Sequence, residues 1–326
     1  MDTKPLEKFA QAARRQLHEQ VKARLAQVLQ TDSPELRAKA NVVAELNKQI
    51  ALSSRQAVIE RVAYTWFNRF CALRYMDANR YTRLGIVSPA AGNTQPEVLQ
   101  EAKAGHIDEE LARFVDGQRV FDLLSGRLPA PDGQGEAYRL LLVASCNQYH
   151  AVMPFLFEKI DDYTELLMPD DLLSASSVLA TAREVLTEAV CQDVEVIGWL
   201  YQFYISEKKD AVIGAKKAIT PENIPAATQL FTPNWIVRYL VQNSLGRLWL
   251  LNRPNSRLAE QMEFYIGERS SVIGERLSVN GEPSVPTDHR PPLTDNGLPI
   301  TDYLKITSPE DLTVCDPAVG SAHMLT

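Results

Sequence analysis

The strongest constraint on the fold lies at residues 312–325, which read LTVCDPAVGSAHML. The apolar run at 312–314 is typical of a short strand, and it is followed by the acidic Asp316, a loop of small residues and the apolar start of a helix. Small residues let a backbone approach a ligand closely, and a helix start offers unpaired N–H groups at the positive end of the helix dipole. This order of elements predicts the cradle of a nucleotide-like cofactor in an α/β domain.

Two common nucleotide-binding loops are excluded at this position, because the segment has neither G-x-G-x-x-G nor Gly-Lys-Ser/Thr. The loop instead resembles motif I of the S-adenosylmethionine-dependent DNA amino-methyltransferases. The matching residues are Asp316, Pro317, Ala318, Gly320, Ser321, Met324 and Leu325. Ala322 replaces the family's second glycine; a positive φ would strain it, but alanine is small enough for the loop to keep its fold. The alternative interpretation is any strand–turn–helix unit of an α/β protein.

A second match lies upstream, where the Phe-Thr-Pro segment 231–233 looks like motif X of the same enzymes. Thr232 is a good helix N-cap and Pro233 a good first helical residue, so we predict a helix that begins at Pro233. Its apolar stripe would consist of Ile236, Val237, Leu240, Val241 and Leu245. A helix N-terminus beside the motif I loop suits the carboxylate of the cofactor's methionine end.

The chain is more closely similar to one branch of these enzymes, the adenine-specific DNA methyltransferases of the BREX phage-defence system (the PglX family). Segments 64–76 and 195–209 carry this resemblance together with motifs X and I. It implies the N-terminal portion of a cytoplasmic enzyme that transfers a methyl group from S-adenosylmethionine to the exocyclic amine of a flipped adenine. Double-stranded DNA would be the substrate, and other BREX defence proteins are candidate partners. The same two segments also resemble type IIG restriction–methylation enzymes, so that branch stays open.

The resemblance assigns a cofactor site but no catalytic residue. The implied cofactor-binding residues are Phe231, Thr232, Pro233, Asp316, Pro317, Ala318, Gly320 and Ser321, with Asp316 facing the cofactor's amino group. The family's catalytic tetrapeptide is Asn-Pro-Pro-Tyr/Phe, and the nearest match, at residues 290–293, lacks the Asn and the aromatic residue. We therefore expect the tetrapeptide beyond Thr326 and no activity from these residues alone. A non-catalytic helical module that binds DNA or protein is the rival hypothesis.

Hydrophobic periodicity predicts an all-α N-terminal domain over residues 1–210. A long opening helix is indicated by Leu6, Phe9, Ala10, Ala13, Leu17, Val21, Leu25 and Val28, which recur at intervals of three and four. A connector is predicted at 211–232, because it contains Gly214, Pro221 and Pro225.

Residues 233–326 are predicted to begin a Rossmann-like α/β methyltransferase domain. After the motif X helix, a stretch rich in Pro, Gly and Ser at 253–309 reads as an insertion, with short strands near 264–266 and Val272. Motif I would follow at 312–325.

Composition and charge narrow the functional classes. A hydrophobic content of 45% and a charged content of 23% are ordinary for a soluble globular protein, and no apolar run is long enough to span a bilayer. Four isolated cysteines and five histidines without ligand spacing predict no metal site. Residues 1–83 hold 15 Lys and Arg against 8 Asp and Glu, whereas residues 84–200 hold 7 against 19. The basic segment could face a phosphate backbone, and the acidic one suits a protein partner or solvent.

Several groups of side chains allow two interpretations. The aromatic residues of 64–75 could stack on bases, but their helical spacing favours a core face. Six arginines could contact phosphates, although an ion-paired or solvated helix face is favoured: Arg55, Arg61, Arg69, Arg74, Arg80 and Arg83. The lysine pairs at 208–209 and 216–217 fit DNA contact and simple solubility equally well. The aspartate pairs at 161–162 and 170–171 are expected to cap helices rather than to bind metal.

Overall fold

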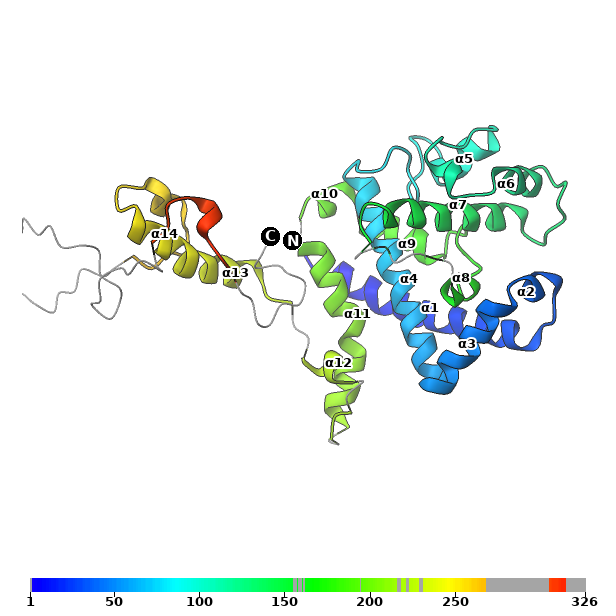
Figure 1. The fold of residues 1–326 in the computed structure, drawn as a ribbon, viewed down its shortest axis with the longest axis horizontal. Coiled ribbons are helices and arrows are strands. Elements are labelled where there is room, and N and C mark those ends of the chain that lie inside the picture. The colour runs from blue at the N-terminus through cyan, green and yellow to red at the C-terminus, as the bar shows by residue number, and fades with distance from the viewer. Residues whose placement is uncertain are drawn as a thin grey trace, which may run out of the picture. The chain divides into compact units, whose positions relative to one another are not determined.

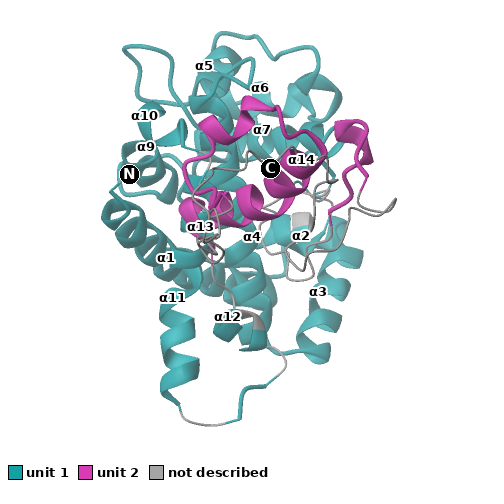
Figure 2. Ribbon diagram, turned by 90° about the vertical axis from the view of Figure 1, so that its left-hand side faces the viewer, with its two compact units in different colours: residues 1–228 teal, residues 229–326 magenta. Residues whose placement is uncertain are grey.

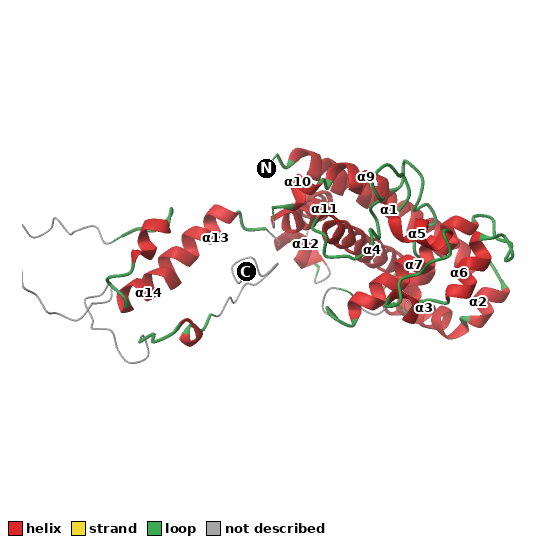
Figure 3. Ribbon diagram, turned by 90° about the horizontal axis from the view of Figure 1, so that it is seen from above, coloured by secondary structure: helices red, strands yellow, loops and turns green. Residues whose placement is uncertain are grey.

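The computed structural model describes residues 2–154, 157, 160, 162–193, 195–215, 218–220, 223–228, 231–267 and 305–314. The chain divides into two compact units, residues 1–228 and residues 229–326 (Figure 2). Every regular element of the described residues is a helix, and no strand is found among them (Figure 3). No helix in this part of the chain is long and apolar enough to cross a membrane.

The first unit combines long helices with short ones (Figure 1). They are α1 (Lys4–Gln30), α2 (Pro34–Ala38), α3 (Ala40–Leu52), α4 (Arg55–Ala78), α5 (Glu97–Lys103), η1 (Leu111–Arg113), α6 (Gly117–Leu124), α7 (Gly133–His150), α8 (Tyr163–Leu166), α9 (Val178–Val185), α10 (Glu188–Cys191), α11 (Glu195–Gly214) and α12 (Ile224–Thr228). The predicted helical character of the N-terminal part is confirmed. Helix α11 continues past the predicted domain end at residue 210 to Gly214, because no glycine or proline lies between residue 210 and that glycine.

The core of this unit forms where α1 packs against α4 and α11. Every residue predicted for the apolar stripe of α1 is buried, from Leu6 through Val28. Residues spaced by three and four lie on one face of a helix, so a single stripe of α1 can contact both neighbours. Burying one large apolar side chain contributes roughly 1.5–3 kcal/mol relative to leaving it in water.

The aromatic run of α4 belongs to this core. Trp66, Phe67 and Phe70 are almost completely buried, and the ring of Phe67 lies 4.4 Å from that of Tyr204 on α11. The indole Nε1–H of Trp66 donates to the carbonyl of Thr164 at 2.9 Å, which satisfies the polar end of this buried side chain. These rings are therefore core residues, as their helical spacing predicts, and they are not available to stack on bases.

Short polar side chains cap the helix starts. Ser54, Asp116 and Asp132 each accept a hydrogen bond from the third backbone N–H after them. Asp162 likewise accepts from the N–H of Thr164 and caps α8, as predicted. The prediction is wrong for the pair at 170–171, because Ser177 caps the next helix, α9, and Asp170 pairs with Arg139 instead. No group of His, Cys, Asp or Glu in the described residues is arranged to hold a metal ion. Asp161 lies outside the described residues.

The cysteines of the first unit are small core side chains. Cys71, Cys146 and Cys191 are free thiols and buried. Burial raises the pKa of Cys146 to about 12, so this thiol stays protonated and unreactive at neutral pH. Cys315 lies outside the described residues.

One carboxylate links the three long helices. Glu60 of α4 accepts from Arg14 of α1 at 2.8 Å and from Lys208 of α11. His18 Nε2 lies 3.7 Å from Glu60 Oε1, and together with Lys208 and Arg14 it lowers the pKa of Glu60 to about 2 against the opposing effect of burial. Lys208 is thus engaged within the helical unit, whereas Lys216 and Lys217 lie outside the described residues.

Replacement of Glu60 by Gln should destabilise the protein by about 2 kcal/mol at pH 7, because Arg14 and Lys208 would lose a half-buried charged partner. The ordinary pKa of 4.5 falls to about 2 on folding, so this contribution is fully present above pH 4.5 and is lost as the pH falls towards 2. Urea unfolding at pH 7, 5 and 3 measures it. Glu19→Gln is the matched control, because its pair with Lys22 is highly exposed and contributes little. A difference between wild type and Glu60→Gln that does not shrink in acid would contradict the assignment.

The second unit is organised by one helical stretch. Helix α13 (Asn234–Val241) continues through a π-helical segment, η3 (Gln242–Gly246), into α14 (Arg247–Asn252). Two 3-10 turns follow, η4 (Arg257–Gln261) and η6 (Pro309–Asp311). Val272 and residues 315–325 lie outside the described residues.

Neither of the strands predicted at 264–266 and 312–314 is found among the described residues. Leu312 has an extended backbone, with φ −72° and ψ 115°, but an extended segment becomes a strand only when a neighbouring backbone pairs with it. No described segment pairs in this way with either stretch. The predicted sheet is therefore not seen in the described part of the second unit and stays a prediction.

Candidate functional site

The predicted cofactor site is divided between described and undescribed residues. Phe231, Thr232 and Pro233 of the motif X segment are described, whereas the predicted motif I residues Asp316, Pro317, Ala318, Gly320 and Ser321 lie outside the described residues. The approach to motif I, residues 305–314, is described. The geometry can therefore be followed from the start of α13 to the chain that leads into motif I.

The helix begins one residue later than predicted. Pro233 is the N-cap rather than the first helical residue, with φ −56° and ψ 143°, and Asn234 is the first residue of α13. The Pro233 carbonyl accepts from the N–H groups of Ile236 and Val237 at 2.9 and 3.2 Å. The proline ring fixes φ at a value common to helix and extended chain, so only ψ decides on which side of the boundary it lies. The positive end of the helix dipole is thus at Asn234, directly after the Phe-Thr-Pro segment.

Only part of the predicted apolar stripe on this helix is shielded from solvent by the described residues. Phe231 and Val237 are buried. Leu240 is 43% exposed, and the neighbouring Trp235 and Tyr239 are 58% and 39% exposed. A broad apolar face on α13 is therefore open in the described part of the molecule.

Side-chain amides of the π-helical segment bind the backbone of residues 264–266. Gln242 Oε1 accepts from the N–H of Phe264 at 2.7 Å, and Asn243 Oδ1 accepts from the N–H of Ile266 at 2.8 Å. Asn243 Nδ2 donates to the carbonyl of Phe264 at 2.8 Å. The two amides thus make the hydrogen bonds that a neighbouring strand would otherwise provide. A π-helical turn is uncommon and often marks a functional part of a helix.

Two further contacts fix the same segment. Arg238 pairs with Glu263 at 3.0 Å, and its guanidinium lies 5.2 Å from the ring centre of Phe264. Gly246 is buried under Met262, where an added Cβ would meet Met262 Cε at 2.6 Å. The glycine therefore allows the methionine side chain to pack directly on the helix backbone.

The end of α14 holds the chain that leads towards motif I. Asn252 Oδ1 accepts from the N–H of Ile306 at 3.0 Å, and Arg253 Nη1 donates to the Ile306 carbonyl at 2.9 Å. Arg253 also donates to the carbonyl of Thr307, and its guanidinium lies 3.9 Å from the ring centre of Trp249. Asn252 and Arg253 thus position the chain at residues 306–307 against the end of α14.

Asp311 sets the direction of the last described residues. Its Oδ2 accepts from the N–H groups of Thr307 and Ser308 at 2.8 and 2.9 Å and from the Thr307 hydroxyl. The bond from the Thr307 side chain, followed by those from the backbone, lowers the pKa of the Asp311 carboxyl. Leu312 then leaves this turn in an extended conformation, directly before the motif I segment.

Asn243→Ala should loosen the segment at 264–266 without unfolding the helix. Ile266 would lose the acceptor of its N–H, so its amide hydrogen should exchange roughly tenfold faster, as expected for the loss of one hydrogen bond. Hydrogen exchange followed by mass spectrometry measures this. Ser244→Ala is the matched control, because the Ser244 hydroxyl donates only to the Leu240 carbonyl one turn earlier in the helix. Equal exchange in both variants would show that the amide of Asn243 does not hold the segment.

Comparison with known proteins gives two relatives, although no protein-family model matches the chain. It is 44% identical over 274 residues to the adenine-specific methyltransferase BrxX of Escherichia coli O9:H4 (strain HS), an alignment that covers 83% of this chain and 20% of that protein. It is 31% identical over 363 residues to the adenine-specific methyltransferase PglX of Lacticaseibacillus casei (strain Zhang), covering 100% of this chain and 28% of that protein. The chain therefore spans less than a third of the length of the curated relatives it matches.

Proposed function

Because this chain belongs to the family of the BREX adenine-specific methyltransferases BrxX and PglX, we propose that it forms the N-terminal portion of a DNA methyltransferase. The proposed reaction transfers a methyl group from S-adenosylmethionine to the exocyclic amine of a flipped adenine in double-stranded DNA. Its proposed setting is phage defence in the cytoplasm, beside other BREX proteins. The observation that carries the proposal is the 44% identity to BrxX over most of the chain.

The described part of the motif X segment suits the methionine end of the cofactor. The N-terminus of α13 lies at Asn234, and the positive end of a helix dipole favours a carboxylate. Thr232 and Pro233 precede it, and Phe231 is buried, which provides an apolar neighbour. We propose that Phe231, Thr232 and Pro233 line this end of the site. The cofactor, when bound, supplies the methyl group.

The proposed domain organisation follows the same reasoning. Residues 1–210 would form the helical domain, 211–232 the connector and 233–326 the start of a Rossmann-like α/β domain, with motif I at 312–325. Gln242, Asn243, Asn252 and Arg253 support this proposal, since they hold the chain on either side of residues 268–304 to one helical stretch.

We expect no methyl transfer from these 326 residues alone, because the family's Asn-Pro-Pro-Tyr/Phe tetrapeptide is not among them. Incubation of the chain with tritiated S-adenosylmethionine and unmodified DNA should leave the DNA unlabelled. Label above that of a heat-inactivated sample would contradict this expectation and would show that another residue holds the target base.

Gly320→Val in the whole gene product should abolish S-adenosylmethionine binding, because the branched side chain would fill the space where the backbone approaches the cofactor. Asp316→Ala should weaken binding by about 1.5–3 kcal/mol through loss of a charge-assisted hydrogen bond. Calorimetric titration measures both.

Gly214→Val is the matched control for this experiment, because an added Cβ at Gly214 meets nothing within 4 Å. If Gly320→Val binds the cofactor as tightly as Gly214→Val, the motif I loop is not the cofactor site. The non-catalytic helical module would then be the better interpretation.

A further inference from the structure

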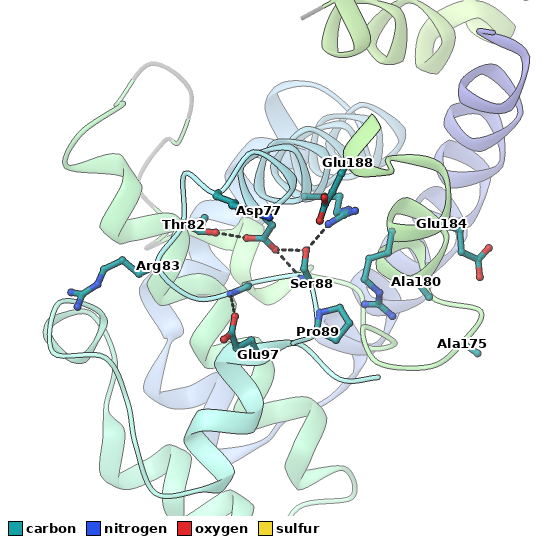
Figure 4. A pocket seen from close by; sticks show the side chains of 14 residues that line it. Asp77, Thr82, Arg83, Ser88, Pro89, Glu97, Ala175, Ala180, Glu184 and Glu188 are labelled. Atoms are coloured by element: carbon teal, nitrogen blue, oxygen red, sulfur yellow. Dashed lines mark hydrogen bonds between the residues drawn. The ribbon is translucent and has the colours of Figure 1, made fainter. Parts of the chain in front are cut away.

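Three of the arginines that the sequence places near one another line a single pocket in the first unit. Arg74, Arg80 and Arg83 come from the end of α4 and the loop after it, and Arg183 of α9 joins them from far along the chain. The pocket has a volume of about 730 Å³. Figure 4 shows the side chains that line it. The other arginines of α4 serve different purposes: Arg61 donates to Tyr163, and Arg69 is buried beside Trp66.

One carboxylate of the pocket, that of Asp77, already accepts hydrogen bonds from five donors of the loop that follows α4. Asp77 Oδ2 accepts from the N–H groups of Val87 and Ser88, both at 2.8 Å, and from the Ser88 hydroxyl at 2.9 Å. Its Oδ1 accepts from Thr82 Oγ1 at 2.8 Å and from the N–H of Ile86 at 3.1 Å. Figure 4 shows Asp77 pointing towards Ser88 and Thr82. These five neutral donors leave Asp77 little capacity to pair with an arginine.

The loop closes tightly around this carboxylate. Gly85 donates its N–H to Glu97 Oε2 at 2.7 Å, which engages a second carboxylate of the pocket. An added Cβ at Gly85 would lie 2.3 Å from the Ser88 carbonyl oxygen, so only glycine fits this turn. The wall formed by the loop is thus fixed by main-chain geometry.

Two guanidinium groups are fixed at the pocket without a carboxylate partner among the described residues. Arg74 donates Nε–H to the Leu186 carbonyl at 2.9 Å and Nη1–H to Ser88 Oγ at 2.7 Å. Arg183 donates Nη1–H to the Val87 carbonyl at 3.2 Å. A guanidinium carries five N–H donors, so these bonds orient both groups and leave donors for an anion.

Arg80 occupies a backbone conformation that normally belongs to glycine. Its φ is +59°, and it is the one non-glycine residue with positive φ in the described part of the chain. The bonds Tyr81 N–H to Met76 C=O and Arg80 N–H to Asp77 C=O close the end of α4 as a Schellman motif, whose left-handed position usually carries Gly. A residue with a Cβ is strained in this conformation. The Arg80 guanidinium makes no ion pair or hydrogen bond with the described residues.

We propose that this pocket binds a phosphate group, with Arg74, Arg80 and Arg183 as its ligands. A phosphate offers several acceptor oxygens, and guanidinium groups match them in pairs of hydrogen bonds. The other carboxylates that line the pocket, Glu184 and Glu188, are exposed and form no ion pair with these arginines in the described part of the chain. Local strain at Arg80 fits such a role, because strained residues gather at binding sites.

The favoured source of this phosphate is the backbone of the DNA substrate, an assignment that rests on the proposed function. Phosphate contacts supply much of the affinity of DNA-binding proteins. The six arginines at 55–83 give the first unit a basic segment, and three of them meet at this pocket. A free nucleotide carries the same phosphate chemistry and is the other source that the experiment distinguishes.

The test uses Arg80→Gly, because this change should relieve backbone strain and at the same time weaken phosphate binding. Removal of the strain should leave the melting temperature unchanged or raise it. Loss of the guanidinium should weaken binding of inorganic phosphate, measured by calorimetry at constant ionic strength, roughly tenfold. Arg183→Gln should weaken it similarly. Arg55→Gln is the matched control, since Arg55 is exposed at the opposite end of α4.

The same variants are titrated with a fluorescein-labelled DNA duplex at several salt concentrations and with a nucleoside triphosphate. If DNA affinity falls and its salt dependence decreases by about one ion, the source is the DNA backbone. If only nucleotide affinity falls, the source is a free nucleotide. If inorganic phosphate binds wild type, Arg80→Gly and Arg183→Gln equally, or binds none of them, the proposal is overturned. S-adenosylmethionine binding, measured separately, shows whether the proposed methyltransferase function fails as well.

Discussion

Burial of the apolar stripe of α1 is the constraint on which the helical unit depends. Helix α1 contacts α4 and α11 at once, so burial of its stripe fixes how the two other helices pack against it. Closing them also brings Glu60, Arg14 and Lys208 together from three helices. A half-buried carboxylate needs such partners, because losing its water without them would cost more than the packing around it gains.

Glu60 and Asp77, both on α4, find hydrogen-bond partners of opposite kinds. This difference explains which arginines of the first unit keep donors for a ligand. Cations surround Glu60, and its pKa falls to about 2. Asp77 is instead surrounded by backbone N–H and hydroxyl groups, and burial raises the pKa of its carboxyl against their effect. Arg14 and Lys208 are thus paired with Glu60 inside the helical unit. At Asp77 neutral donors satisfy the carboxylate, so the arginines beside it keep donors that can face a ligand.

In the second unit, side chains make the hydrogen bonds to the backbone that a neighbouring strand would make in a sheet. Gln242 and Asn243 bond the main chain at 264–266, and Asn252 and Arg253 bond it at 306–307. Backbone polar groups need partners wherever they leave water, and an amide side chain carries a donor and an acceptor in nearly the same geometry as a peptide. One helical stretch can therefore fix two segments that lie about 40 residues apart in sequence.

The sequence alone determined the features that depend on neighbours three or four residues away. The buried stripe of α1, the aromatic core face of α4 and the capping aspartates follow from such local patterns. The motif I residues Asp316 and Gly320 rest on resemblance and on the order of the two motifs. Tertiary structure decided the rest: the meeting of Arg183 with Arg74 at one pocket, the start of α13 after Pro233, and the extended, unpaired state of Leu312 among the described residues. Each of these depends on groups distant in sequence or on a ψ angle that residue type does not fix, and a local pattern contains neither.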